Sequence, residues 1–156
     1  MNILTFDLEE WFHILNNAST DNEPSWGNFE YRLRQNIDRI LSLLDDSNNI
    51  ATFFCLGWVA RKYPHIISEI DSLGHEIGSH SNSHQLIYRY DRDFFKKDLE
   101  ISINSLENIT GKKVKAYRAP GFSLINRTLW AFEELALQGI EFDCSIFLGN
   151  HSHGGR

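Results

Sequence analysis

The sequence predicts an α/β fold in which helices cover a parallel β-sheet. Short apolar segments typical of strands alternate with longer segments whose apolar residues recur at helical spacing. This alternation, repeated through five strands, favours parallel pairing. The chain has 156 residues, which is the size of one domain. In such sheets the chemistry lies at the carboxyl ends of the strands.

Five segments are predicted to be strands. The first is Ile3–Phe6, and the second, Ala51–Cys55, is apolar on both faces, as a buried strand should be. The third and fourth are His75–Gly78 and Val114–Tyr117. The fifth is indicated by apolar residues that alternate with polar ones, namely Ile140, Phe142, Cys144 and Ile146.

Four segments are predicted to be helices, because their apolar residues fall on one face. They run from about Phe29 to Asp46, through the stripe Ile66–Leu73, from about Asp93 to Ile109, and from Asn126 to Gly139. The polar stretch Asn16–Gly27 is expected to be an extended loop.

Composition excludes several classes of protein. The formal net charge of −6 argues against a general nucleic-acid binder. No apolar run approaches the roughly 20 residues that cross a bilayer, and Met1–Leu8 lacks the features of a secretory signal. We therefore expect a cytoplasmic protein without a membrane span. Cys55 and Cys144 each lie in an apolar stretch, so buried free thiols are expected rather than a disulfide.

Three carboxylates follow the first predicted strand, in Asp7-Leu-Glu-Glu10. Carboxylates this close repel one another unless water or a cation separates them. Asp7 and Glu9 are two residues apart, so they point the same way on an extended chain. Taken alone, such a run is more often a solvated acidic loop.

Two histidines follow the third predicted strand, in His80-Ser-Asn-Ser-His84. A spacing of four brings both imidazoles to one face of a helical turn, where they can bind one ion. The spacing arises often by chance, and two surface histidines are the more frequent explanation of a lone pair. The position across the sheet from the carboxylates favours a metal site.

The fourth predicted strand ends in Arg118-Ala-Pro-Gly-Phe122. An ordinary strand-to-helix turn with a surface arginine explains this segment equally well when it is taken alone. The functional interpretation is an arginine that orients a carboxylate, together with a backbone N–H aimed at developing negative charge.

Together the three strand ends predict a metal-assisted hydrolase. One carboxylate and two histidines form a ligand set that Zn, Fe, Co, Mn or Ni accepts. A second carboxylate remains free to act as a base.

These motifs resemble those of the polysaccharide deacetylase (NodB-homology) superfamily, the fourth carbohydrate esterase family and its relatives. Thr5–His13 resembles the first motif, in the variant with a residue between the two acids. His80–His84 is similar to the second motif, and Arg118–Ser123 to the third. Ala51–Gly57 is similar to the family's second strand. The resemblance runs from Met1 to about Phe147, and three motifs in the right order are a specific signal.

The resemblance implies a distorted (β/α) barrel, usually of seven strands. It implies a hydrolase that removes N-acetyl groups from amino sugars of a polysaccharide or its precursor, by attack of a metal-bound water that Asp7 activates. His80 and His84 would be metal ligands and Glu9 the carboxylate ligand, with Glu10 as the alternative. One divalent ion is expected, zinc first, with Co, Mn, Ni or Fe as alternatives.

The resemblance also assigns roles around the metal. Arg118 would hold Asp7 and keep it ionised, and the N–H of Gly121, where many relatives have Tyr, would help to stabilise the oxyanion. Pro120 and Trp11 are expected to contact the substrate along with Gly121. A sugar-stacking wall is a further interpretation of three aromatic residues, although each alone is more often core: Trp11, Phe12 and Trp26.

The leaving amine needs a proton, which the resemblance assigns to a histidine in a later motif. Only five strands are readable, so we expect residues 1–156 to be the N-terminal part of a single deacetylase-like domain. The closing strands and the acid would then lie beyond Arg156, and the isolated chain would be poorly stable or weakly active. His151 and His153 are weak substitutes for the acid, and His13 is expected to be structural.

Two other functions stay open. One is an amidohydrolase of the same fold acting on a small cyclic amide or ureide, and the other is a truncated domain that binds metal or glycan without turnover. The intact Asp7, His80, His84 and Arg118 argue against a loss of activity, whereas the short length argues for it. The expected partner is an N-acetylated glycan, and the oligomeric state is left open.

Overall fold

The computed structural model describes residues 3–149 and 151–155. Its centre is a five-stranded sheet in the order β1-β2-β3-β4-β5, and every pair of neighbours is parallel. Helical segments connect each strand to the next. The predicted α/β alternation is therefore confirmed. The strands β1 and β5 are the two edges of the sheet, so the barrel is not closed within the described residues.

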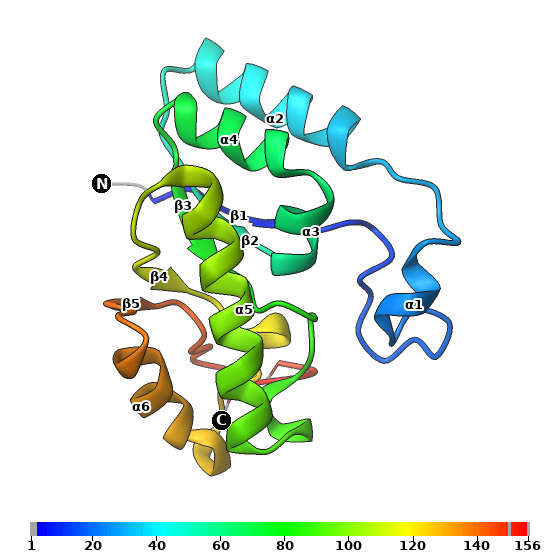
Figure 1. The fold of residues 1–156 in the computed structure, drawn as a ribbon, viewed down its shortest axis with the longest axis vertical. Helices are drawn as coiled ribbons and strands as arrows, with labels where there is room; N and C mark the ends of the chain where they lie inside the picture. Colours follow the sequence, from blue (N-terminus) through cyan, green and yellow to red (C-terminus); the bar gives the residue numbers. More distant parts are fainter. Residues whose placement is uncertain (1–2, 150, 156) are drawn as a thin grey trace.

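The strands are β1 (Thr5–Leu8), β2 (Thr52–Cys55), β3 (Glu76–Ser79), β4 (Ala116–Tyr117) and β5 (Phe142–Asp143). The helices are α1 (Glu23–Trp26), α2 (Leu33–Asp46), α3 (Gly57–Lys62), α4 (Pro64–Ser72), α5 (Arg92–Thr110) and α6 (Trp130–Leu137) (Figure 1). Three 3₁₀ turns cover Ile87–Arg89, Pro120–Phe122 and Asn126–Thr128.

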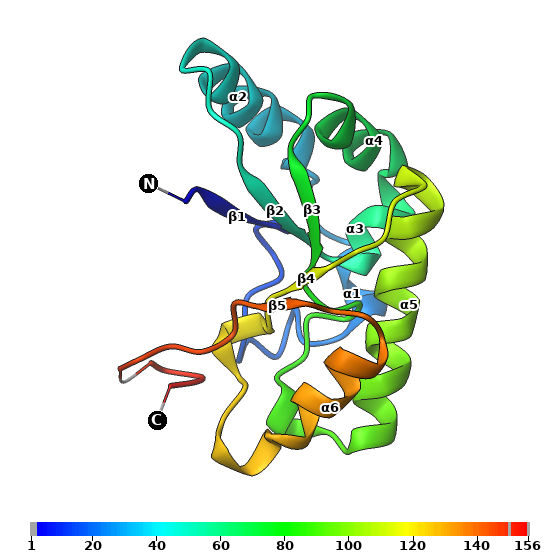
Figure 2. The same cartoon turned by 90° about the vertical axis from the view of Figure 1, so that its left-hand side faces the viewer.

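Helices α4, α5 and α6 lie along one side of the sheet, and the C-terminal segment lies on the other (Figure 2). The predicted apolar stripes face the strands: Ile66, Ile67 and Ile70 of α4 are fully buried, as is Leu106 of α5. One continuous apolar core results. Because it holds the strands in register, it also fixes the positions of the loops at their carboxyl ends.

The first strand begins two residues later than predicted. Ile3 is 74% exposed, and pairing with β2 starts at Thr5, opposite Thr52. This shift places Asp7 inside β1, with Glu9 directly after the strand.

Helices α1 and α3 were not predicted from the sequence. Within the segment expected to be an extended loop, the Asn22 side chain accepts the N–H of Ser25 and starts α1. Helix α3 has six residues, and its first four are buried, so it shows no apolar stripe in the sequence.

The last strand is shorter than predicted, and its apolar residues face solvent. Phe142 is 58% exposed and Ile146 50%, whereas Ser145 is fully buried. The reason is a hydrogen-bonded link, in which Ser145 Oγ donates to Asp143 and accepts the N–H of Ala119. This link turns Ser145 inward and fixes the turn after β4.

Both cysteines are free thiols, as expected. Cys55 is fully buried, but Cys144 is only partly buried, which corrects the expectation for that residue. Among the described residues, no helix is both long and apolar enough to cross a membrane.

Candidate metal centre and active site

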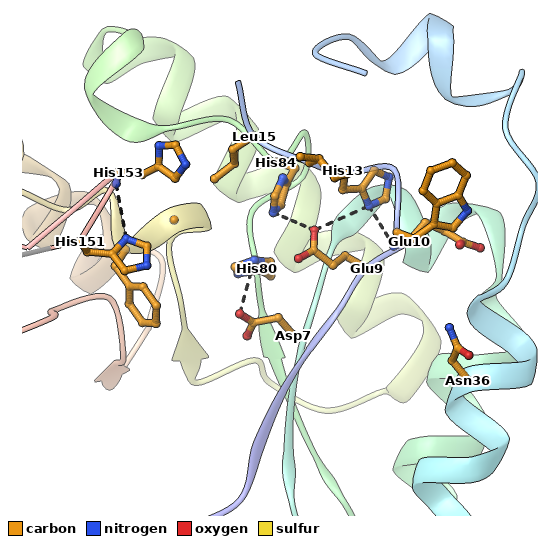
Figure 3. Close-up of a pocket in the computed structure, with 14 residues that line it drawn as sticks. Asp7, Glu9, Glu10, His13, Leu15, Asn36, His80, His84, His151 and His153 are labelled. Carbon is orange, nitrogen blue, oxygen red and sulfur yellow. Dashed lines mark hydrogen bonds and ion pairs between the residues drawn. The ribbon is translucent and has the colours of Figure 1, made fainter. Parts of the chain in front are cut away.

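The carboxyl ends of β1, β3 and β4 open into one pocket of about 540 Å³ (Figure 3). The three motifs of the sequence meet there, although they are separated by up to 111 positions in the chain. The lining residues are Asp7, Glu9, Glu10, Trp11, His13, Ile14, Leu15, Asn36, His80, His84, Gly121, Phe122, His151 and His153.

The structure brings together the three predicted metal ligands. One ligand atom each from Glu9, His80 and His84 lies within 4.8 Å of the other two. Oε2 of Glu9 is 2.9 Å from Nε2 of His84, and both histidines are buried. The geometry is that of a small set of donors converging on one point.

The donor chemistry of this cluster fits a divalent cation. Nδ1 of His80 lies 2.8 Å from the carbonyl oxygen of Arg118, so that Nδ1 carries the proton and the lone pair of Nε2 faces the cluster. Burial lowers the pKa of His80, which keeps the imidazole neutral. Oε2 of Glu9 is buried against Nε2 of His84, and a shared cation would satisfy both atoms.

Glu9 and Glu10 are adjacent but have different surroundings. The Glu10 side chain is buried and accepts the backbone N–H groups of Arg32 and Leu33 at 3.0–3.1 Å. A carboxylate at this position satisfies the free N–H groups at the start of α2 and suits the helix dipole. The structure therefore places Glu9, and not Glu10, in the ligand cluster. The same contact explains why α2 begins at Leu33 rather than Phe29.

The two histidines meet through an irregular loop, not on a helical turn as the spacing predicted. Ser81 and His84 have positive φ angles of 65° and 54°, which are unusual for residues other than glycine. The N–H of His84 donates to Ser81 Oγ at 3.1 Å, and the N–H of Gly57 donates to the Ser81 carbonyl at 2.9 Å. These hydrogen bonds hold the loop that presents both imidazoles.

Arg118 forms hydrogen bonds with Asp7 and Thr5. Its Nη1 donates to Asp7 Oδ1 at 2.8 Å, and its Nη2 donates to Thr5 Oγ1 at 2.9 Å. The guanidinium also lies 4.2 Å above the ring of Phe54. Asp7 Oδ2 is left facing the cluster, 3.9 Å from Nε2 of His80.

The three expected substrate contacts lie in different places. Gly121 lines the pocket at φ 59°, and a Cβ there would lie 2.8 Å from both Leu15 and His153, so a larger residue would not fit without movement. Trp11 lines the pocket and is 44% exposed. Pro120 is buried and is not among the lining residues.

The proposed aromatic wall is reduced to one residue. Phe12 is fully buried and Trp26 is 2% exposed, so both belong to the core and neither lines the pocket. Trp11 is held at the rim, because its Nε1 donates to the carbonyl of Glu30 at 2.8 Å and its ring contacts Phe29 edge to face.

His13 lines the pocket beside the cluster, although its interactions are those of a buried structural residue. Its Nδ1 accepts the N–H of Glu10 at 3.1 Å, and its ring packs 4.3 Å from that of Trp26. Burial, with the nearby His84 and His80, lowers the pKa of His13 to about 3, so the ring is neutral. The 3.9 Å approach to Glu9 is therefore not an ion pair.

Asn36 was not predicted from the sequence, whereas His151 and His153 were expected there only as weak substitutes for the acid. Asn36 and the His151–His153 segment stand on opposite sides of the cluster (Figure 3). Asn36 lies on the polar face of α2, where no motif marks it. His153 is placed by Asn16, whose amide lies 3.2 Å from Nδ1 of the imidazole.

The chain belongs to the polysaccharide deacetylase family, whose model matches residues 17–140. This match contains His80, His84 and Arg118. Asp7 and Glu9 lie outside it, so their place in the site rests on the geometry described above.

Two curated relatives and one solved structure illustrate the similarity. A peptidoglycan-N-acetylglucosamine deacetylase of Bacillus cereus is 35% identical over 62% of this chain and 35% of its own length. Chitin deacetylase 1 of Saccharomyces cerevisiae is 31% identical over 68% of this chain and 35% of its own. A protein of Mycobacterium smegmatis assigned as a polysaccharide deacetylase has a TM-score of 0.74 and 28% identity, over 90% of this chain and 49% of its own. The chain thus spans about a third of the length of these curated relatives.

Proposed function

We propose that this protein is a metal-dependent hydrolase that removes N-acetyl groups from the amino sugars of a polysaccharide or its precursor. The observation that carries the proposal is the convergence of Glu9, His80 and His84 in one pocket, beside an Asp7 that Arg118 orients. Membership of the family supports it, as do relatives named as deacetylases of peptidoglycan and chitin.

Glu9, His80 and His84 would hold one divalent ion, with zinc as the first candidate. A bound ion of this kind supplies Lewis-acid chemistry, which acidifies a water molecule and stabilises negative charge on oxygen. The arrangement uses Nε2 of His80, whose Nδ1 is fixed by the backbone of Arg118.

Asp7 is suited to act as the general base. Arg118 occupies Oδ1, so Oδ2 is free to accept a proton from the attacking water. The water oxygen then bonds to the acetyl carbon, the C–N bond breaks, and the amine leaves with a proton. Arg118 keeps Asp7 oriented, and its positive charge favours the ionised carboxylate. The N–H of Gly121, at the pocket wall, would donate to the developing oxyanion.

Trp11 gives the pocket a place for a sugar ring. Its indole is half-exposed at the rim and fixed by the hydrogen bond to Glu30. A fixed aromatic face suits the apolar face of a pyranose ring. The family resemblance assigns the proton donor to the amine to a histidine of a later motif, and His151 and His153 of the pocket wall are the alternative among the described residues.

Acetate release from N-acetylglucosamine oligomers tests the proposal. The zinc-loaded protein is expected to release acetate, and Asp7→Asn should lower the rate by about 10²–10⁴-fold while zinc stays bound. Hydrolysis of small cyclic amides without acetate release would favour the amidohydrolase instead. Zinc binding without turnover of either substrate would favour a non-catalytic domain.

A further inference from the structure

A buried carboxylate on α5 contacts the loop between the two histidines. Asp98 is 8% exposed, and its Oδ2 accepts the N–H of Asn82 at 2.7 Å. Its Oδ1 accepts the N–H of Ser83 at 3.0 Å, together with the Ser83 hydroxyl. Three donors from Asn82 and Ser83, the two residues that precede His84, thus converge on the Asp98 carboxylate. No hydrogen bond joins this carboxylate to His80 or His84.

Asp98 occupies an apolar position of its helix. It lies on the same buried stripe as Phe95 and Leu99, where an apolar side chain would complete the core. Burial raises the pKa of Asp98, because the charged carboxylate loses its hydration in the core. A carboxylate at this position gives the core less stability than an apolar residue would, so its use must lie in the contacts that it makes.

The loop that Asp98 contacts has no regular backbone structure of its own. Ser81 and His84 are in the left-handed region, and the N–H groups of Asn82 and Ser83 have their acceptors on Asp98. In addition, the N–H of Trp58 at the start of α3 donates to the Asn82 carbonyl at 3.2 Å. The loop is therefore clamped between α3 and the Asp98 carboxylate.

Gly57 shows how closely this clamp fits. A Cβ at Gly57 would lie 2.8 Å from Asn82 Oδ1 and 3.1 Å from the Cα atoms of Asn82 and Ser102. The loop is thus packed closely against α3, and it is also tied to α5 through Asp98.

We propose that Asp98 is a positioning residue for the metal centre, which fixes the 80–84 loop in the conformation that presents His80 and His84 to one ion. The inference rests on the proposed metal site. Its physical basis is that ligands held in place before binding lose less conformational freedom when the ion arrives. Without Asp98 the strained loop would relax, and the imidazoles would have to be ordered by the ion itself.

Zinc affinity of the metal-free protein, measured by isothermal titration calorimetry, tests the inference. Asp98→Asn keeps the size of the side chain but replaces one acceptor oxygen by an NH₂ group, so at least one loop N–H loses its acceptor. The expected result is a zinc Kd about 10–100-fold weaker than that of the wild type, as for other residues that orient metal ligands. The melting temperature of the metal-free variant, measured alongside, shows that the protein titrated is folded.

Glu100→Gln is the matched control. It removes one carboxylate from the same helix, two positions on, but Glu100 is exposed and does not touch the loop. Its zinc Kd should stay within about twofold of the wild type, because long-range charge effects at the surface are screened. A purely structural role for Asp98 predicts a lower melting temperature with an unchanged Kd, and that result would overturn the inference.

Ser83→Ala provides a second, milder variant in case Asp98→Asn does not fold. It removes only the hydroxyl donor to Asp98, and the expected Kd is weaker by about threefold. An unchanged Kd in this variant would also overturn the inference. A wild-type protein that binds no zinc would refute the proposed metal site as well, whereas zinc binding that is equally tight in all variants would refute only the role of Asp98.

Discussion

Polar side chains at the two ends of the sheet differ in their burial and in their hydrogen-bond partners. At the carboxyl ends of the strands, Nε of Arg118 is buried without a hydrogen-bond partner, and Oε2 of Glu9 is buried against Nε2 of His84. At the amino ends, polar groups pair at the surface: Nζ of Lys115 lies 2.8 Å from Oε1 of Glu141, and Thr52 Oγ1 donates to Oε2 of Glu76 at 2.6 Å.

The difference separates a functional end of the sheet from a structural one. Exposed ion pairs contribute little to the free energy of unfolding, so the charges at the amino end have little effect on stability. Buried polar atoms without partners cost free energy, and a ligand that satisfies them offsets that cost. The carboxyl end is therefore expected to respond to substitution in activity and metal affinity, and the amino end in stability alone.

The largest contrast is expected between Arg118 and Lys115. Arg118→Met removes the group that orients Asp7, and acetate release should fall by about 10³-fold, near the range for loss of a general base. Lys115→Met removes a cation from the amino end, breaks its pair with Glu141, and should leave the rate unchanged. Rates measured at saturating zinc check both expectations. Equal rates in the two variants would show that the two ends do not differ as described.

A second contrast lies within the carboxyl end, between Glu9 and Glu10. Glu9→Gln should weaken zinc binding by about 100-fold with little change in stability, because it alters a metal ligand in a pocket. Glu10→Gln should lower the free energy of unfolding by about 1–2 kcal/mol, because it weakens the cap on α2. Calorimetric titration and urea unfolding of both variants give the two quantities. The opposite result, in which Glu10→Gln loses zinc affinity and Glu9→Gln keeps it, would show that Glu10 is the metal ligand.

The smallest expected effect is a pH dependence at the amino end. His75 is 7% exposed, its Nδ1 accepts the N–H of Ala51, and burial lowers its pKa below 6.5. Below pH 6.5 the unfolded chain therefore binds a proton at this residue that the folded chain resists, so stability is lost as the pH falls. Between pH 7.5 and 5.5 the wild type should lose more unfolding free energy than His75→Gln, by at most about 1 kcal/mol. Urea unfolding at both pH values measures this difference, and parallel losses in the two proteins would contradict it.

The sequence predicted the parallel sheet and the motifs that meet at its carboxyl end, since parallel pairing and the positions of the strand ends follow from the alternation of strands and helices. The sequence could not decide whether Glu9 or Glu10 is the metal ligand. That decision depends on where α2 begins, and the start of α2 is itself determined by its contact with Glu10. The fifth strand was predicted to be longer than it is, because the Asp143–Ser145–Ala119 link interrupts the period of two after Asp143.

The loop of the two histidines shows the same limit. The spacing predicted that His80 and His84 meet, which they do, but through positive φ angles rather than a helical turn. The sequence does contain an indication of the residue that holds this loop. Asp98 and Ser102 are polar residues on the buried stripe of a helix whose other positions there are apolar. Such an interruption marks a place where a buried polar group has a partner from another element.

Glu9, His80 and His84 are proposed to hold one divalent ion. Zinc content per chain, measured by mass spectrometry of the metal after loading and desalting, tests it most directly. The wild type should retain one zinc ion per chain, and a variant combining His80→Ala with His84→Ala should retain none. A wild type without zinc, or a double variant that keeps it, would contradict the account.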